Sequence, residues 1–225
     1  MIKIEKTDVY GWESAIRGAR NPMNSWSRSD SYSSYGNVDT PDGGMGYTFF
    51  IGDNDLSLMK RLVKAGSDHS KFMRMINVTC DITAPLYWWK EYDTYKVGTV
   101  ANSCSTMHKI HDKEFVFEDL SWEHLYSDYD PDNAGSAELA NLILRALNFY
   151  RERYLRTKNK DDWWQMIQLL PTSYNQKRTV QLNYAVLRNM YHSRKNHKLD
   201  EWHTLCDWVE LLPYSELITT KVGEE

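Results

Sequence analysis

The amino-acid sequence predicts a helix-rich α+β protein that folds as a single domain over residues 1–225. Several long segments space their apolar residues as amphipathic helices do, whereas only a few short segments have the composition of strands. No internal repeat is visible. With 41% hydrophobic and 13% aromatic residues, the chain has ample material for one core.

The N-terminal part predicts a short strand, a helix and a long loop. Residues 2–5 have the composition of a strand, and residues 9–20 place four apolar side chains at helical spacing. Residues from about 21 to 50 are rich in Ser, Asn, Asp, Gly and Tyr without a core pattern, which indicates a loop. Loops of this length in compact proteins are usually functional or mobile, and the alternative is a plain insertion.

The middle of the chain predicts a helix, a strand and two short helices. Residues 52–66 begin with Asp and Asn and end with Gly, which is typical helix punctuation. Residues 71–85 alternate and are β-rich up to a proline, which indicates a strand. Short helices are expected at 86–95 and 117–126.

The last part of the chain is dominated by helices. Residues 136–158 form a long amphipathic pattern, and the next helix, at 161–171, ends at its proline. Residues 172–182 are expected to be extended or irregular. Two further helices are expected at 185–194 and 199–212.

Charge and composition exclude several classes of protein. The net charge of −4 and the pI near 6.0 argue against a broad basic face for nucleic acid. The three cysteines are far apart, which fits a reducing compartment and not a disulfide framework. No leader pattern and no apolar run of about 18 residues is present, so we expect a cytoplasmic protein without a membrane span.

No phosphate-binding loop or metal site is expected. Residues 43–46 read GGMG, which lacks both the Lys-Ser/Thr pair and the spacing of a phosphate loop. His108, His111 and Asp112 could suggest a metal site or the His-Asp doublet of phosphohydrolases. No further matching ligand is visible, so we expect no metal.

No catalytic residue can be assigned from the sequence. Cys104 lies near His108 and could in principle be a nucleophile, but no oxyanion feature accompanies it. The pairs Trp88-Trp89 and Trp163-Trp164 are expected in the core or at a subunit interface. A flat ring such as a base or a flavin is the alternative partner for them.

Two polar residues near the C-terminus are spaced to share one side of a helix. Asn183 and Arg194 are eleven residues apart, which on a continuous helix is three turns plus about 20°, over about 16 Å. The planar guanidinium of Arg suits a phosphate because it gives two parallel charged hydrogen bonds. The alternative is a solvated arginine on an exposed helix.

The order and spacing of several motifs resemble those of the flavin-dependent thymidylate synthases. AIRGAR at 15–20 is similar to that family's early helix, and residues 82–92 are similar to the segment that leads into its signature. Residues 58–72 resemble its next helix and the passage after it, with Arg74 in place of a histidine that contacts flavin.

The family signature is present in degenerate form. Residues 94–111, TYKVGTVANSCSTMHKIH, offer Lys96, Asn102 and Ser105 at similar steps, while two arginines, a histidine and a glutamate of the signature are absent. This hydroxyl-rich stretch is either a surface loop or a segment that holds a ligand, and the resemblance favours the ligand.

The C-terminal part shares the family's spacings more closely. LLP at 169–171 is followed at the family's distances by Asn183 and Arg194, and residues 197–202 take the place of its His-Ala-Gln-x-Glu segment. Family members have an arginine four residues before this proline, and this chain has Ile167 there. Lys177 or Arg178 could take the role of the missing arginine.

The resemblance implies a small antiparallel sheet and an FAD-dependent methylation of dUMP to dTMP, or of a related pyrimidine nucleotide. NADPH and methylenetetrahydrofolate would be co-substrates, and the sites would be shared in a homotetramer. The implied substrate-binding residues are Lys96, Ser105, Arg178 and Arg194, and the implied cofactor-binding residues are Arg74, Asn102, Asn183 and His197.

Two alternatives follow from the degenerate signature and the tryptophan pairs. The chain could be a nucleotide-binding or sequestering protein that keeps the fold without flavin chemistry. It could also be an oligomeric structural protein in which the tryptophan pairs form an interface.

Overall fold

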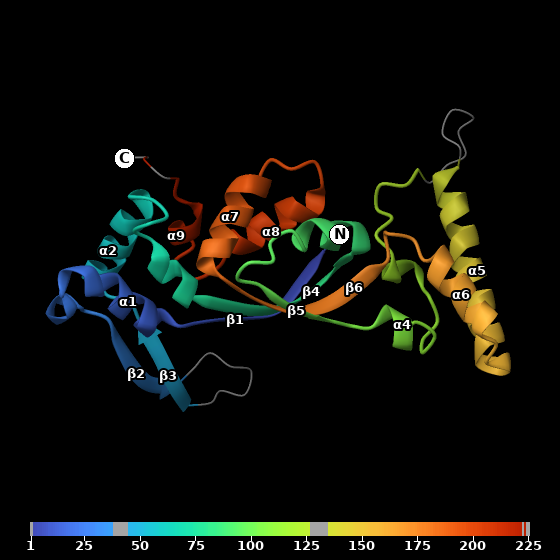
Figure 1. Cartoon of the computed structure of the whole chain (residues 1–225), viewed down its shortest axis with the longest axis horizontal. Helices are drawn as coiled ribbons and strands as arrows, with labels where there is room; N and C mark the ends of the chain where they lie inside the picture. Colours follow the sequence, from blue (N-terminus) through green and yellow to red (C-terminus); the bar gives the residue numbers. More distant parts are fainter. Residues whose placement is uncertain (1, 38–44, 127–134, 222, 224–225) are drawn as a thin grey trace. The chain divides into compact units, whose positions relative to one another are not determined.

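The computed structural model describes residues 2–37, 45–126, 135–221 and 223 (Figure 1). Its contacts divide the chain into two compact units. Unit 1 comprises Met1–Glu5, Asp81–Tyr95 and Ala101–Thr179, and unit 2 comprises Lys6–Cys80, Lys96–Val100 and Val180–Glu225. The single domain expected from the sequence stays a prediction.

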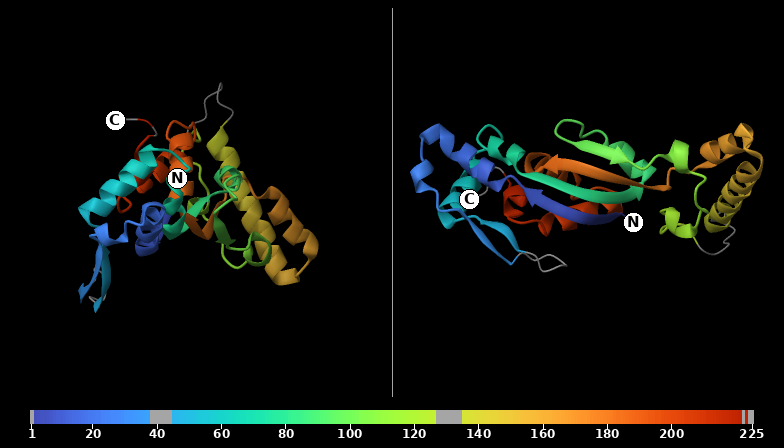
Figure 2. Two further views of the ribbon diagram at one scale, coloured as in Figure 1. Left: turned by 60° about the vertical axis from the view of Figure 1, so that its left-hand side comes forward. Right: turned by 90° about the horizontal axis from the view of Figure 1, so that it is seen from below.

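The main sheet has four strands in the order β1-β4-β6-β5. They are β1 (Lys3–Tyr10), β4 (Asn77–Pro85), β5 (Val100–Ser103) and β6 (Asn175–Asn183), and Figure 2 shows them from a second direction. Val78, Cys80, Ile82 and Ala84 of β4 are buried at every second position, as expected for a strand against a core. The strand expected at 71–85 is confirmed from Asn77 onward as β4, whereas Lys71–Met75 is a 3-10 turn. The extended segment expected at 172–182 corresponds to β6.

Unit 2 contains five α-helices and a buried aromatic core. These helices are α1 (Trp12–Arg20), α2 (Asp53–Lys64), α7 (Tyr184–Arg194), α8 (Asp200–Glu210) and α9 (Glu216–Thr219). Short 3-10 turns lie at η1 (Asn21–Met23), η2 (Trp26–Arg28) and η3 (Lys71–Met75). The buried rings of Trp12 and Tyr184 meet edge to face at 5.2 Å, which ties α1 to the start of α7.

The segment at 21–50 is more regular than the loop expected from the sequence. Within it, β2 (Tyr32–Asn37) and β3 (Met45–Phe50) pair as an antiparallel hairpin (Figure 2). Tyr32 stacks on Phe50 at 5.3 Å and Tyr35 packs against Tyr47 at 5.0 Å, so cross-strand aromatic pairs stabilise the hairpin. The residues 38–44, which include part of the GGMG motif, lie outside the described residues.

Unit 1 contains a helical pair and two short helices. The pair is α5 (Ser136–Thr157) and α6 (Lys160–Leu169), which lie side by side (Figure 1), and the short helices are α3 (Leu86–Tyr92) and α4 (Thr106–Lys109). Leu147 of α5 and Met166 of α6 are fully buried in one apolar cluster. No helix in the described ranges is both long and apolar enough to cross a membrane.

The prediction of a short helix at 117–126 is wrong. Only η4 (Phe117–Asp119) is helical, as a single 3-10 turn. Beyond it Leu120 bridges Tyr174 in an antiparallel sense, and the Ser121 amide donates to the Ser173 carbonyl at 2.8 Å. Pairing with this distant segment satisfies the backbone and removes the need for a helix.

The helix-rich α+β class with a small antiparallel sheet is confirmed. Most helices expected from the sequence begin and end within a few residues of the observed bounds. The predicted patterns at 52–66, 136–158 and 185–194 correspond to α2, α5 and α7.

Candidate functional site

In unit 2, three segments meet at the N-terminus of α7. Asn183 caps the helix, because its Oδ1 accepts a hydrogen bond from the Val186 amide at 3.1 Å. The Tyr184 amide donates to the carbonyl of Ile76, which follows η3, at 3.0 Å. A Cβ on Gly98 would lie 3.2 Å from Asn183 Nδ2, and Gly98 has a φ of +84°, so the 96–100 segment also runs close to this helix end.

These three segments carry three of the residues expected at the site. Asn183 is the cap itself, Arg74 is exposed in η3 two residues before Ile76, and Lys96 is exposed two residues before Gly98. A helix N-terminus has a positive partial charge and favours anions, and the segments that carry Arg74 and Lys96 pass close to this one. This end of α7 is therefore suited to a phosphate group.

The opposite end of α7 brings Arg194 and His197 together around Trp202. The Arg194 guanidinium lies 4.8 Å from the centre of the Trp202 ring, and the His197 ring meets the same indole edge to face at 6.3 Å. The His197 amide donates to the Arg194 carbonyl at 2.9 Å. Asn183 has an extended backbone at the end of β6 and caps α7, and Arg194 is the last residue of α7, so the two do not share one continuous helix as expected and lie about 16 Å apart along its axis.

In unit 1, the hydroxyl-rich stretch runs along β6. β5 neighbours β6 in the sheet, the Cys104 amide donates to the Lys177 carbonyl at 2.9 Å, and Gln176 Nε2 donates to the Cys104 carbonyl at 2.9 Å. Ser105 caps α4 by accepting from the His108 amide at 3.1 Å. Asn102 is exposed on β5, so this part of the stretch presents an amide beside a hydroxyl that already has a structural role.

Arg178 and Lys177, the possible substitutes for a missing arginine, both have internal partners. The Arg178 guanidinium lies 4.2 Å from the centre of the Trp89 ring, donates to Asp93 at 2.8 Å and donates to Gln176 at 3.0 Å. Lys177 forms an ion pair with Asp81 at 3.0 Å, and this hydrogen bond raises the pKa of Lys177. A ligand phosphate would compete with these carboxylates for either cation.

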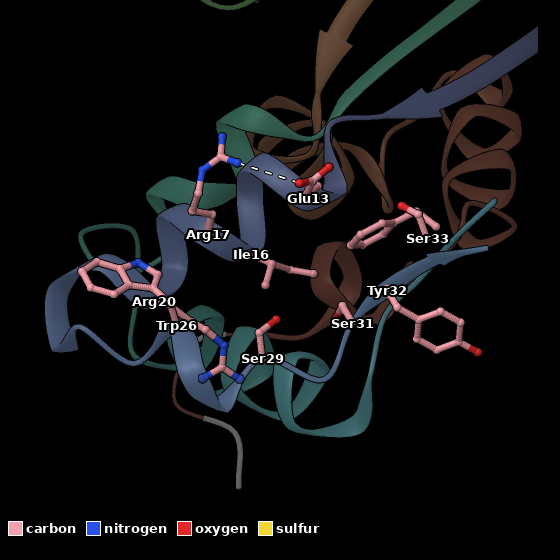
Figure 3. Close-up of a pocket in the computed structure, with 10 residues that line it drawn as sticks. Glu13, Ile16, Arg17, Arg20, Trp26, Ser29, Ser31, Tyr32 and Ser33 are labelled. Atoms are coloured by element: carbon pink, nitrogen blue, oxygen red, sulfur yellow. Dashed lines mark ion pairs between the residues drawn. The ribbon is translucent and has the colours of Figure 1, made fainter. Parts of the chain in front are cut away.

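Residues of the 21–50 segment line a separate pocket in unit 2. It has a volume of about 400 Å³ and is lined by α1 and by residues of the η2 and β2–β3 region, among them Arg17, Trp26 and Tyr32 (Figure 3). Arg17 lies 4.0 Å from Glu13 on the same helix, as the dashed line in Figure 3 shows.

Beneath this pocket, Arg20 and Asp55 form a buried ion pair. The Arg20 Nε donates to Asp55, and its other nitrogens donate to the carbonyls of Ser25 at 3.2 Å and Arg28 at 3.1 Å. Asp55 also accepts from the hydroxyls of Ser29 at 2.7 Å and Ser31 at 2.6 Å. Burial raises the pKa of Asp55, but the hydrogen bonds from Ser31, Ser29 and Arg20 outweigh it and hold the pKa below its usual value.

This network was not predicted from the sequence. The run Ser29-Asp30-Ser31 is typical of a turn, but its partner Asp55 lies 24 residues or more further along the chain. No local spacing connects the two segments. In the part of the chain that the structure describes, no cluster of three or more His, Cys, Asp and Glu side chains could hold a metal ion.

Comparison with known proteins finds likeness in structure and not in sequence. No protein-family model and no curated protein matches the sequence. The structure is similar to flavin-dependent thymidylate synthase ThyX from Helicobacter pylori in complex with FAD and dUMP, with a TM-score of 0.66, 17% identity, and 96% of this chain and 98% of that chain covered. A second structure of that enzyme with FAD and dUMP gives a TM-score of 0.67 at 17% identity, over 96% and 97% of the two chains.

A second kind of protein shares the fold. The UMP/dUMP methylase PolB from Streptomyces cacaoi, bound with 5-Br UMP, is similar with a TM-score of 0.60 and 14% identity, over 97% of this chain and 94% of that one. The resemblance found in the sequence motifs is thereby confirmed at the level of the fold. The chain has the fold of the flavin-dependent thymidylate synthases.

Proposed function

We propose that this chain is a flavin-dependent enzyme that methylates a pyrimidine nucleotide, as in the conversion of dUMP to dTMP. FAD would be the cofactor, and NADPH and methylenetetrahydrofolate the co-substrates. The observation that carries the proposal is the likeness in fold over 96% of the chain to an enzyme crystallised with FAD and dUMP. The convergence of Arg74, Lys96 and Asn183 on the start of α7 supports it.

The residues at this helix end fit anionic ligands, with Arg74 proposed for a phosphate of FAD and Lys96 for the nucleotide. Arg74 and Lys96 are exposed and have no ion-pair partner among the described residues, and the dipole of α7 adds partial positive charge. Bound FAD would supply the redox chemistry of the transfer. The chain would supply binding and orientation, with Arg74, Asn102, Asn183 and His197 facing the flavin.

The nucleotide would be held by Lys96, Ser105, Arg178 and Arg194. Arg194 lies at the far end of α7 from the 96–100 segment that carries Lys96, so in one copy of the chain these two residues of the proposed nucleotide site lie at opposite ends of the helix. We therefore propose a homo-oligomer, a tetramer by resemblance, in which Arg194 of one subunit completes the site of another.

A second candidate function is nucleotide binding or sequestration without catalysis. Ile167, at the position of a family arginine, packs in the apolar cluster of α5 and α6, and Arg178 is held by Asp93. Each charge-assisted hydrogen bond to a phosphate that is lost costs about 1.5–3 kcal/mol. Fewer available cations favour weaker binding of the nucleotide or the flavin.

Turnover tests the enzymatic proposal and separates it from sequestration. With FAD and methylenetetrahydrofolate added, we expect NADPH oxidation that depends on dUMP or another pyrimidine nucleotide. If oxidation is absent while a nucleotide raises the melting temperature, the protein sequesters. A ligand at about 100 times its Kd adds about 2.7 kcal/mol to the free energy of unfolding.

The role of Arg194 is tested in the same thermal assay. Arg194→Ala is expected to lose the nucleotide-dependent shift, because it removes the guanidinium proposed to bind the phosphate. Lys198→Ala, an exposed cation close by, is the matched control and should keep the shift. Equal shifts in both variants would remove Arg194 from the site.

A further inference from the structure

Unit 1 has a cationic and aromatic cavity that none of the proposed site residues lines. Its volume is about 410 Å³, and its walls come from α4, the residue that follows the α4 C-cap, and the connection between α5 and α6. The wall residues used in the argument are His108, His111, Tyr154, Lys158, Lys160 and Trp163. The sequence had singled out both the histidine pair and this tryptophan, and the proposed function uses neither.

Aromatic rings form one part of the wall and are fixed in position. The His111 ring meets the Tyr154 ring edge to face at 4.9 Å, with 72° between their planes. The Trp163 indole N–H donates to the carbonyl of Met107 at 3.2 Å, which holds the indole against α4. Fixed rings give a flat ligand a surface to stack on, at a small cost in side-chain entropy.

Two lysines give the cavity a positive charge. Lys158 Nζ lies 5.5 Å from the centre of the Tyr154 ring, in the cavity wall. Lys160 also lines the cavity, and its Nζ lies 6.0 Å from the ring centre of Trp164, which is outside the lining. Neither lysine pairs with a carboxylate among the residues that the structure describes.

The carboxylates closest in sequence to the cavity residues have other cationic partners. Asp162 pairs with Arg153 at 3.4 Å. Asp112 pairs with Lys109 at 2.9 Å and also lies 3.5 Å from Nε2 of His111, a wall residue. No carboxylate is among the residues that line the cavity. The charge of the two lysines is therefore available to an anion.

The backbone between the two helices holds these lysines in place. Lys158 adopts a left-handed conformation with a φ of 55° and its amide donates to the Tyr154 carbonyl at 2.8 Å. Asn159 then caps α6 by accepting from the Asp161 amide at 3.0 Å. Hydrogen bonds fix both ends of this connection, so the backbone conformation at the two lysines is defined.

His111 contributes an unsatisfied polar atom. Its Nδ1 is buried and has no hydrogen-bond partner in the described residues, while its backbone carbonyl accepts from Arg151 at 3.1 Å. Buried polar atoms of folded proteins are nearly always paired, with protein, water or a ligand.

We propose that this cavity binds a planar aromatic anion, with the ring against Trp163, Tyr154 and His111 and the charged group at Lys158 and Lys160. A ring bearing a phosphate, sulfonate or carboxylate has the required chemistry, and its volume fits about 410 Å³. None of the residues proposed for the nucleotide or the flavin lines this cavity, although Ser105 accepts a hydrogen bond from the amide of His108 in its wall, and the proposal does not depend on the proposed function.

The test uses 1-naphthyl phosphate, with 1-naphthol and inorganic phosphate as its two halves, in calorimetric titrations of the full chain. We expect 1-naphthyl phosphate to bind more tightly than either half. Lys158→Gln combined with Lys160→Gln should weaken its binding at least about tenfold and leave 1-naphthol unchanged, because only the charged contact is lost. Trp163→Phe should weaken binding of both aromatic compounds.

The matched control is Lys90→Gln combined with Lys71→Gln, which removes the same charge at exposed positions outside the cavity. This control should bind 1-naphthyl phosphate as the parent does. The proposal is overturned if the parent binds no 1-naphthyl phosphate, if the Lys158/Lys160 variant binds it as tightly as the control, or if 1-naphthol binds equally well. Arg194→Ala should not alter this binding, so failure here is distinct from failure of the proposed function.

Discussion

Single residues show a division between cations used by the fold and cations left for ligands. Arg20, Arg178 and Lys177 have carboxylate partners inside their own units. Arg74 and Lys96 are exposed at the start of α7. The sequence does not show whether a given Lys or Arg is paired in the fold or exposed, because the carboxylate that would pair with it lies far along the chain.

Among the cations that pair with carboxylates inside the fold, Arg20 is expected to matter most for stability, through its buried ion pair with Asp55. Both side chains are almost fully buried, and the carboxylate accepts from a guanidinium, two hydroxyls and backbone amides. A buried ion pair is tolerated when hydrogen bonds satisfy its remaining lone pairs, and removal of one partner leaves an uncompensated charge.

Asp55→Asn is expected to lower the free energy of unfolding by about 3–5 kcal/mol at neutral pH, because it leaves the Arg20 charge buried without its partner. Urea titration measures this loss. Asp53→Asn, at an exposed position in the same first turn of α2, is the control and should change stability by less than about 0.5 kcal/mol.

The pH dependence of the Asp55 variant has a defined sign. The pKa of Asp55 is lower in the folded chain than its usual 3.8, so its contribution is present above that pH and is lost as the pH falls through the folded value. The parent should therefore lose stability in this acid range more steeply than Asp55→Asn does. Parallel slopes for the two proteins would contradict the role assigned to this carboxylate.

At the scale of elements, sequence and structure agree where the signals are local. The helices at 136–158 and 185–194 follow from the spacing of apolar residues within each segment. The hairpin at 32–50 has exposed aromatic residues and little alternation, so its strands have no core pattern. The segment at 117–126 pairs with residues 173–174, and such a distant partner leaves no local signal.

The start of α7 is the element on which the candidate site depends, and its cap can be tested by itself. Asn183→Ala should lower the free energy of unfolding by about 1 kcal/mol, because the Val186 amide loses its acceptor. Asn183→Asp keeps an acceptor of the same length and should retain most of the stability. Equal losses in both variants, measured by urea titration, would show that the cap is not what stabilises this end.

At the scale of the whole molecule, the order and spacing of motifs predict the fold although the signature itself is degenerate. The likeness in structure extends over 96% of the chain at 17% identity, with no match to a family model. Core positions tolerate many apolar residues, whereas binding of a phosphate depends on particular cations. The sequence could therefore predict the fold, but not which of its cations remain free.

The placement of the site residues also explains what could not be predicted. Arg74, Lys96 and Asn183 come from three segments far apart in sequence that converge on one helix end. Arg194 and His197 gather around Trp202 at the other end. In the proposed homo-oligomer, a second copy of the chain supplies the residues at one helix end to a ligand at the other.

The central claim is that the start of α7 binds the phosphates of FAD, and an FAD titration followed by visible absorption tests it most directly. We expect the parent to bind FAD, and Arg74→Gln to bind it at least about tenfold more weakly. The control, Lys64→Gln, removes the same charge from an exposed position of unit 2 and should bind FAD as the parent does. The claim is contradicted if the parent binds no FAD, or if Arg74→Gln binds it as tightly as the control.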